Sequence, residues 1–434
     1  MIVQRYLSGT TSVNIAASVE RAIADGRLAA GALLVPVRAA AQQLSVAPAT
    51  VAAAYRLLAD RGVVVGEGRR GTRVRPAPPL TAPAEAKLPD GVRDLAAGNP
   101  DPRLLPDLAR AMKQVKLEQR LYDADLNDPA LVALAREQFR ADGIRAEQVT
   151  VVSGAMDGVE RVLREHLRPG DRVIVEDPCF TGIRDLLSAL SLAPVAVAVD
   201  DEGLDPRALQ RALRSAAALI VTPRAQNPTG AAHSPRRARE LRSVLAARPE
   251  LLVLEDDHAG AVAGAEYLTL IDRHRTRWAV VRSVSKSLGP DLRVALVASD
   301  PQTHARVEGR QNLGIRWVSH VLQRLVVALS KDRAPLRAGR LYAERREALL
   351  RALAERGIAA HARSGLNVWI PVPEESAVVQ ALLQKGWGVT AGERYRIDTP
   401  PAIRVTVAAL EPKDAARFAT DLAAAMAARG PRGA

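Results

Sequence analysis

The stretch WAVVRSVSKSLGPDLRVALVASD, residues 278–300, decides the fold. Apolar runs at 279–281 and 294–298 flank a polar turn, which is the pattern of two buried strands joined by a loop. The turn carries a single lysine, Lys286. A lysine held between buried strands is partly removed from water, which favours the neutral amine that attacks carbonyl compounds. We therefore predict a strand, a turn with a nucleophilic amine, and a second strand.

Hydrogen-bond donors surround this lysine in the sequence. Ser283 and Ser285 precede it, and Arg293 follows it. Hydroxyl and guanidinium groups are the donors that an anionic phosphate requires. Pyridoxal 5′-phosphate (PLP) combines an aldehyde for a lysine with a phosphate for such donors, so we predict a PLP site with Lys286 as its catalytic residue. The alternative is an ordinary solvated loop lysine, and this motif taken alone does not decide between the two.

Two motifs upstream add weight to the prediction. LIVTPRAQNPTG contains Asn227 in an NPTG turn, and the buried run LLVLEDDHAG ends in Asp256, Asp257 and His258. An NPxG turn, an acid at a strand end and an SxxK motif with a following arginine, in this order, resemble fold-type I aminotransferases. The resemblance implies that Asn227 binds the phenolic oxygen of PLP and that Asp256 pairs with its pyridinium nitrogen. His258 stands where the family usually has tyrosine and can still donate to the phenolic oxygen, whereas Asp257 is interpreted as structural.

Further segments match the same family. VTVVSGAMDG predicts a strand, a turn and a helix, and free N–H groups at the helix start would bind phosphate at Ser153, Gly154 and Ala155. An ordinary capped helix start is the alternative there. Phe180, in DRVIVEDPCFTG, matches the aromatic ring that stacks on the pyridine, although a simple core phenylalanine would also fit.

Two residues match family positions that contact the carboxylate of a substrate or the cofactor of a partner subunit. Arg404, in AIRVTV, matches the arginine that grips the α-carboxylate of a substrate, here an effector, and the alternative is an arginine pointing outward from an edge strand. Tyr122 matches the tyrosine that reaches the cofactor phosphate of a partner subunit. Asn127 replaces the glycine that usually follows this tyrosine.

The composition sets outer limits on function. A chain of 434 residues with 48% hydrophobic and 25% charged residues is long enough for two or three soluble domains. No apolar run is long enough to span a bilayer and the N-terminus lacks a signal-peptide layout, so we expect a cytoplasmic protein. A single cysteine excludes an internal disulfide, and the seven histidines show no metal-ligand spacing, so we predict no metal site. The net charge of +13 suggests an anionic partner, although an arginine-rich genome would also produce it.

The first 75 residues form a unit of their own. Ile15, Val19 and Ile23 have the spacing of an amphipathic helix, a second helix fits 37–44, and a third begins at Pro48 and runs to residue 62. Two helices joined by a short turn predict a helix-turn-helix. Apolar residues 63–65 and the segment 71–75 then predict a hairpin.

The hairpin contains Gly66, Gly68 and Gly71 in the spacing of a dinucleotide-binding loop, but a strand rather than a helix follows, so we reject that function. Residues 1–80 contain ten arginines and four acidic residues and so carry +6 of the net charge. A basic hairpin suits contacts with DNA phosphates or the minor groove.

The segment resembles the GntR-type winged helix-turn-helix, whose pattern it matches at Arg38, Thr50, Val51, Tyr55 and Gly62. Ala47-Pro48 replaces the usual Ser-Arg at the start of the third helix, so sequence readout would rest on the wing and on DNA shape. A three-helix dimerisation module is the alternative. The residues predicted to contact DNA are Arg38, Thr50, Arg56, Arg69, Arg70 and Arg73.

The predicted fold class is α/β, with an N-terminal winged helix-turn-helix and a fold-type I aminotransferase domain. The latter should contain a central, mostly parallel sheet and a small C-terminal α+β subdomain. We predict the DNA-binding domain at 1–75, a proline-rich linker at 76–92 and the aminotransferase-like domain at 93–434. Within the last domain, 307–332 reads as one long helix. The linker and the C-terminal tail look disordered.

A GntR-type domain joined to an aminotransferase-like domain resembles the MocR group of bacterial transcription regulators. The resemblance implies a homodimer that binds a double-stranded DNA operator and senses an amino acid, an amine or PLP. TPRAQNPTG looks like members whose effector is PLP itself. The alternative function is an active aminotransferase with a DNA-binding appendage, since the residues for transamination are present. A scaffold that has lost its cofactor is disfavoured because Lys286, Asp256, Asn227 and Arg293 are all intact.

Overall fold

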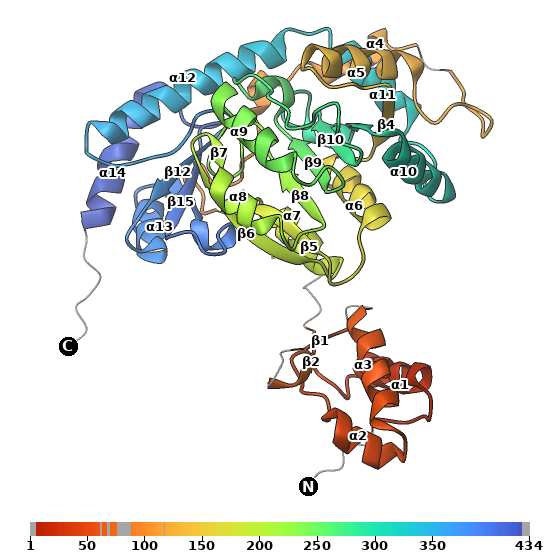
Figure 1. Cartoon of the computed structure of the whole chain (residues 1–434). Helices are drawn as coiled ribbons and strands as arrows, with labels where there is room; N and C mark the ends of the chain where they lie inside the picture. The colour runs from red at the N-terminus through yellow and green to blue at the C-terminus, as the bar shows by residue number, and fades with distance from the viewer. Residues whose placement is uncertain (1–5, 61–62, 67–69, 76–87, 117, 428–434) are drawn as a thin grey trace. The chain divides into compact units, whose positions relative to one another are not determined.

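The structure is a computed structural model that describes residues 6–60, 63–66, 70–75, 88–116 and 118–427. Contacts divide the chain into two compact units (Figure 1). One contains 1–85 with 167–172 and 184–194, and the other contains 86–166, 173–183 and 195–434. The domain limits given above remain a prediction. Most of the proposed linker, the C-terminal tail, Gly62 and Arg69 lie outside the described residues.

The N-terminal domain is a winged helix-turn-helix, as predicted. Its elements are α1 (Ser12–Ala24), α2 (Val37–Leu44), α3 (Pro48–Asp60), β1 (Val64–Gly66) and β2 (Thr72–Val74). Ser45 adopts a left-handed conformation (φ 53°) and ends α2, which makes the short turn into α3 possible. Ile15, Val19 and Leu58 are fully buried in the core between the helices. The antiparallel β1–β2 pair forms the predicted hairpin.

An eight-stranded sheet forms the centre of the second domain. In spatial order it contains β4 (Gln148–Val152), β11 (Ala295–Ser299), β10 (Trp278–Ser283), β9 (Leu252–Asp257), β8 (Ala218–Val221), β5 (Arg172–Asp177), β6 (Ala193–Asp200) and β7 (Gly203–Leu204). Strands β10, β9, β8 and β5 are parallel, whereas β11 is antiparallel to both β10 and β4. The segment 278–300 is therefore the predicted strand, turn and strand, with the turn at the carboxyl end of β10.

Helices surround this sheet. They are α4 (Leu108–Gln114), α5 (Pro129–Ala141), α6 (Ala155–His166), α7 (Thr181–Ala189), α8 (Pro206–Ala212), α9 (Pro235–Leu245), α10 (Pro301–Leu313), α11 (His320–Leu329) and α12 (Ala334–Ala354). Gly158 lets α6 approach the sheet closely, because an added Cβ would lie 3.1 Å from both Val152 and Val281. The prediction of one long helix at 307–332 is wrong. The chain leaves helical geometry at Gly314 and takes a left-handed conformation at Arg316 (φ 61°), which separates α10 from α11.

The long helix α12 leads into a C-terminal subdomain of the predicted α+β type (Figure 1). Its sheet has the order β12 (Asn367–Pro371), β15 (Ala402–Thr406) and β14 (Thr390–Ala391), and it is covered by α13 (Glu375–Gln384) and α14 (Ala415–Ala427). A short strand at the beginning of the domain, β3 (Arg93–Asp94), pairs with β13 (Trp387–Gly388). The first residues of the domain are thereby attached to its last part.

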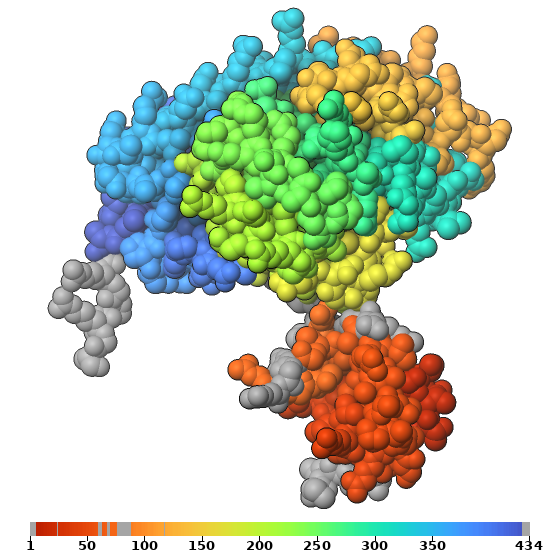
Figure 2. Space-filling model, viewed as in Figure 1, coloured from red at the N-terminus to blue at the C-terminus, as the bar shows by residue number. Residues whose placement is uncertain are grey.

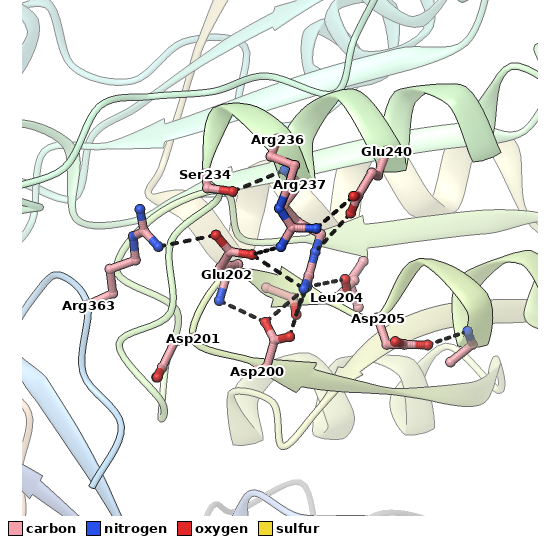
Figure 3. A network of polar contacts seen from close by, with 12 residues as sticks. Asp200, Asp201, Glu202, Leu204, Asp205, Ser234, Arg236, Arg237, Glu240 and Arg363 are labelled. Atoms are coloured by element: carbon pink, nitrogen blue, oxygen red, sulfur yellow. Dashed lines mark hydrogen bonds and ion pairs between the residues drawn. The ribbon is translucent and has the colours of Figure 1, made fainter.

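A polar network between the β6–β7 turn and the start of α9 connects the two subdomains (Figure 3). Arg237, near the start of α9, donates to both carboxylate oxygens of Asp200 at 2.9 and 2.7 Å and to the carbonyl oxygen of Leu204 at 2.9 Å. Arg363, from the C-terminal subdomain, lies 3.5 Å from Glu202 on the same β6–β7 turn. The network fixes the start of α9 and hence the loop that precedes it.

Candidate functional site

Lys286 lies in a cavity of about 160 Å³ at the carboxyl ends of the parallel strands. Burial lowers the pKa of Lys286, and the positive charge of Arg404 lowers it further. Its Nζ donates a hydrogen bond to the carbonyl oxygen of Gly98 at 2.8 Å. Eight of the predicted site residues line the cavity together: Ala155, Phe180, Asn227, Asp256, His258, Ser283, Ser285 and Lys286.

Asp256 points into the cavity from the end of β9. Its carboxylate oxygen Oδ1 is buried and has no hydrogen-bond partner among the residues that the structure describes. Burial, and secondarily the charge of Asp257, raises the pKa of Asp256 to about 7. A cation bound in the cavity would stabilise the ionised carboxylate and satisfy this oxygen.

Asn227 and His258 line the cavity together with the lysine turn. Asn227 Oδ1 accepts hydrogen bonds from Asn367 Nδ2 at 3.3 Å and from Arg404 Nη1 at 3.2 Å, which orients the amide of Asn227. Burial, and then the charge of Lys286, lowers the pKa of His258 to about 4. The imidazole is therefore neutral near pH 7 and keeps one N–H to donate.

The turn before α6 meets Arg293 next to Ala155, the first residue of α6, which lines the cavity. Arg293 Nη2 donates to the carbonyl oxygen of Ser153 at 3.3 Å. Gly154 has a φ of 92°, which favours glycine, and the absence of a Cβ lets Arg293 Nη2 approach, because an added Cβ would lie 2.7 Å from it. Ser283 Oγ lies 3.1 Å from Ser285 Oγ and accepts the Ser285 N–H. An arginine, two hydroxyls and a helix N-terminus are thus gathered as an anion site requires.

Glu176 is a cavity residue that the sequence reasoning missed. Burial raises the pKa of its carboxyl to about 7, and the carboxyl accepts hydrogen bonds from the Thr222 N–H at 3.1 Å and from Gln226 Nε2 at 3.2 Å. Its position at the end of a buried strand, four residues before Phe180, was a usable signal because site residues collect at strand ends in such folds.

Asp257 has the structural role predicted for it. Arg224 Nε and Nη2 donate to its two oxygens at 2.9 Å each, and Arg282 Nε donates at 2.6 Å. The Arg282 guanidinium packs over the Phe139 ring at 4.7 Å. Arg224 therefore braces the turn before Asn227 rather than facing the cavity.

Arg404 lies on β15, the central strand of the small sheet, so the alternative of an edge-strand arginine is wrong. It is 5% exposed and packs over the Tyr395 ring at 4.9 Å. Its Nη2 donates to the carbonyl oxygen of Ala96 and lies 3.5 Å from Thr390 Oγ1. These contacts hold the arginine in place, and its predicted contact with an effector carboxylate stays a prediction.

Tyr122 lies on the surface, with 76% of its area exposed. Its ring packs against Trp317 at 5.8 Å, and Arg316 lies over the Tyr122 ring at 5.5 Å. Tyr122 is not among the residues that line the cavity of its own chain. Its predicted contact with the cofactor phosphate of a partner subunit stays a prediction.

The predicted DNA contacts have different surroundings within the N-terminal domain. Arg38, Arg56 and Arg70 are exposed, and Thr50 near the start of α3 is half-buried. Arg73 on the wing donates to the carbonyl oxygen of Gly31 at 3.0 Å. Tyr55, one of the GntR-type positions, is buried and donates to the carbonyl oxygen of Val35 at 2.7 Å.

The residues of the cavity fit PLP. The unpartnered Asp256 oxygen suits a pyridinium N–H, the Gly154 turn with Arg293 suits a phosphate, and Lys286 suits an aldehyde. Bound there, PLP would supply an aldehyde for the amine and a ring that withdraws electrons. In the described part of the chain, no group of three or more His, Cys, Asp or Glu side chains could hold a metal ion, and no helix is long and apolar enough to cross a membrane.

A winged helix-turn-helix joined to an aminotransferase fold with a lysine-centred cavity defines a class of DNA-binding proteins with a cofactor domain. Comparisons with known families agree: residues 11–74 match "Bacterial regulatory proteins, gntR family", and 91–422 match "Aminotransferase class I and II". The chain therefore belongs to the MocR group of transcription regulators, whose implied cofactor is PLP.

Particular relatives share the whole arrangement. The vitamin B6 salvage pathway transcriptional repressor PtsJ of Salmonella typhimurium is 40% identical over 96% of this chain and 98% of its own length. The pyridoxine biosynthesis regulator PdxR of Corynebacterium glutamicum is 27% identical over 87% of each chain. Among solved structures, the α-aminoadipate aminotransferase LysN of Thermus thermophilus superposes with a TM-score of 0.69 at 24% identity, over 80% of this chain and 95% of its own.

Proposed function

We propose that this protein is a cytoplasmic, homodimeric transcription regulator whose effector is PLP itself, captured at Lys286. The observation that carries the proposal is the buried, unpartnered Asp256 oxygen in the cavity that also contains the Lys286 amine. The Asp256 carboxylate would pair with the cationic ring of PLP, and the Lys286 amine would react with its aldehyde. The two side chains thus fit two groups of the same molecule. The 40% identical relative, named as a repressor of vitamin B6 salvage, supports the same effector class.

The protein would respond to PLP if its two arrangements had different affinities for PLP. A ligand shifts a protein between two arrangements only if it binds one of them more tightly. Engagement of Lys286 would remove N–H donors from the bond to Gly98, and Gly98 lies shortly after β3, the first strand of the domain. PLP capture would therefore alter a segment that the chain joins to the linker and the DNA-binding domain.

Exposed apolar side chains support the homodimer. Met112, Leu121, Leu313 and Ile315 are all more than half exposed, with Leu313 at 84%. Figure 2 shows the orange segment that follows residue 100 beside the teal segment of α10 and α11 at the right of the large domain. Exposed apolar side chains on neighbouring segments favour an interaction surface, and a second copy of the chain would cover them and bring in Tyr122.

The visible absorption spectrum tests the cofactor assignment. Incubation of the purified full chain with PLP should produce the band of lysine-bound PLP, and Lys286→Ala should lack that band while keeping its fold by circular dichroism. Salt-sensitive binding to DNA from upstream of its own gene tests the regulator. Absence of the band of lysine-bound PLP from the wild type would contradict the PLP assignment.

An active aminotransferase is the second candidate function, favoured by the intact set Lys286, Asn227 and Asp256 around one cavity. Turnover of an amino acid with an α-keto acid at about 1 per second or faster would support it. Absence of turnover together with PLP-dependent DNA binding would support the regulator.

A further inference from the structure

Glu176, which lines the cavity, forms a buried hydrogen-bonded pair with Gln226. Gln226 Nε2 donates to Glu176 Oε2 at 3.2 Å, and the exposed fractions of Glu176 and Gln226 are 4% and 1%. The other carboxylate oxygen, Oε1, accepts from the Thr222 N–H at 3.1 Å. Backbone pairing of β5 with β8, two strands that the structure describes in full, covers residues 173–174 and 218–219. The Glu176 side chain therefore joins the two strand ends beyond their backbone pairing.

Gln226 has one amide orientation that satisfies its neighbours. Thr229 donates to Gln226 Oε1 from its N–H at 2.9 Å and from its Oγ1 at 2.6 Å. On the opposite side, Gln226 Nε2 donates to Glu176 and to the carbonyl oxygen of Pro178, the latter at 2.7 Å. A flipped amide would place its NH₂ group against the Thr229 N–H, so that a donor would face a donor. Gln226 therefore requires an acceptor at position 176.

This pair connects the two loops that carry Phe180 and Asn227. Pro178, which accepts from Gln226, lies two residues before Phe180, and Gln226 directly precedes Asn227. Phe180 and Asn227 both line the cavity, and they are predicted to contact the ring face and the phenolic oxygen of PLP. The bonds of Glu176 and Pro178 to one amide thus hold together two loops that PLP would contact from different directions.

We propose that Glu176 is a positioning residue for PLP, whose carboxylate acts through Gln226 to hold the Phe180 loop and the Asn227 loop at the separation that the cofactor ring requires. The inference rests on the proposed function, because it concerns the same site. A carboxylate suits this role since it offers only acceptors. A glutamine at this position would place its NH₂ group against either the Thr222 N–H or Gln226 Nε2.

Glu176→Gln tests the proposal, and Glu255→Gln is the matched control. Glu255 lies on the neighbouring strand β9, is fully buried, and accepts from the hydroxyls of Tyr267 and Thr269. It is not among the described residues that line the cavity. It precedes Asp256, but successive side chains of a strand point to opposite faces. The control thus makes the same chemical change in a carboxyl group that is buried outside the site.

The measurement is the affinity of each purified full chain for PLP, determined from the absorption band of lysine-bound PLP. An unsatisfied buried donor costs enough to weaken binding by about fivefold or more, so we expect at least this loss in Glu176→Gln. We expect Glu255→Gln to stay within about twofold of the wild type, because its changed contacts lie outside the cavity. A loss below fivefold in Glu176→Gln, or an equal loss in the control, overturns the proposal.

A double variant separates positioning from folding by exchanging donor and acceptor. In Glu176→Gln combined with Gln226→Glu, the amide at position 176 can donate to the carboxylate at position 226, which still accepts from Thr229. The bond to the Pro178 carbonyl oxygen is lost. We expect the double variant to bind PLP more tightly than Glu176→Gln does. Equal or weaker binding, with the fold intact by circular dichroism, contradicts the role of the pair.

Hydrogen–deuterium exchange supplies a readout that needs no cofactor. In the PLP-free chain, the backbone amides of residues 177–183 and 222–231 should exchange faster in Glu176→Gln than in the wild type, and at the wild-type rate in Glu255→Gln. Unchanged exchange in Glu176→Gln overturns the proposal. Absence of the PLP band from the wild type is a separate failure that contradicts the proposed function, while the exchange rates still test whether Glu176 holds the two loops.

Discussion

Asp256 and Asp257, neighbours at the end of β9, have pKa values shifted in opposite directions. Burial raises the pKa of Asp256 to about 7. Burial would also raise the pKa of Asp257, but the charges and hydrogen bonds of Arg282 and Arg224 outweigh it and lower the value to about 2. Successive side chains of a strand point to opposite faces, so one carboxyl faces the cavity and the other faces the two arginines. One strand end thus provides a ligand group and a structural anchor.

Asp256→Asn should stabilise the PLP-free protein at alkaline pH and weaken PLP binding. An acid whose pKa is higher in the folded than in the unfolded chain binds more protons when folded, so the free energy of unfolding falls as pH rises from about 4 to about 7. The variant lacks this loss, and its advantage should reach roughly 3–5 kcal/mol above pH 7. Urea denaturation at pH 5 and at pH 8 measures the difference.

The same variant has a built-in control. At pH 5 the advantage of the variant should be much smaller than at pH 8, because most of the loss in the wild type occurs between pH 5 and pH 7. If the variant and the wild type were equally stable at both pH values, or bound PLP with the same affinity, Asp256 would not be the buried acid that contacts the cofactor ring.

Asp257→Ala should destabilise the domain by about 3–5 kcal/mol, because it leaves Arg224 and Arg282 buried without their shared partner. Asp142→Ala is the matched control, since Asp142 binds Arg282 at 2.6 Å but is 25% exposed. The control should cost less than half as much. Similar losses in the two variants, measured by urea denaturation at pH 7, would refute the anchoring role of Asp257.

Features that depend on neighbouring residues in the chain were predicted well, whereas contacts between residues far apart in the chain were not predicted. The strand, turn and strand around Lys286 and the helix-turn-helix follow from apolar periodicity and turn residues, which act over short stretches. The break at Gly314 was missed because the residues on both sides have helical patterns. The contacts of Arg404 with Ala96 and of Lys286 with Gly98 join residues that are far apart in the chain. No local pattern encodes such pairings, which depend on how the subdomains pack.

Arg70→Ala should weaken DNA binding and reduce its salt dependence. Arg70 is exposed on the wing, and each phosphate contact contributes about 0.9 to the slope of log affinity against log salt. Arg73→Ala should act differently, because Arg73 donates to the Gly31 carbonyl oxygen and so holds the wing to the domain. We expect it to lower the melting temperature as well as the affinity. Fluorescence anisotropy over a salt series, with thermal melts alongside, separates the two effects, and identical behaviour of both variants would contradict this assignment.

Leu313→Asp should shift the protein from dimer to monomer. A charge placed on an exposed apolar residue costs little in the monomer but opposes burial against a second copy. Sedimentation velocity of the wild type and the variant measures the shift. Leu336→Asp is the control, because Leu336 is also exposed but lies on α12, which carries none of Met112, Leu121, Leu313 and Ile315. A monomeric wild type would contradict the proposed homodimer.

The central claim is that capture of PLP by Lys286 changes the affinity of the DNA-binding domain. Its most direct test is the affinity of the full chain for DNA from upstream of its own gene, measured at one salt concentration with and without PLP, for the wild type and for Lys286→Ala. We predict that PLP changes the affinity of the wild type by about fivefold or more, the range of allosteric coupling, and leaves that of the variant unchanged. An equal effect of PLP on both proteins, or no effect on either, would contradict the claim.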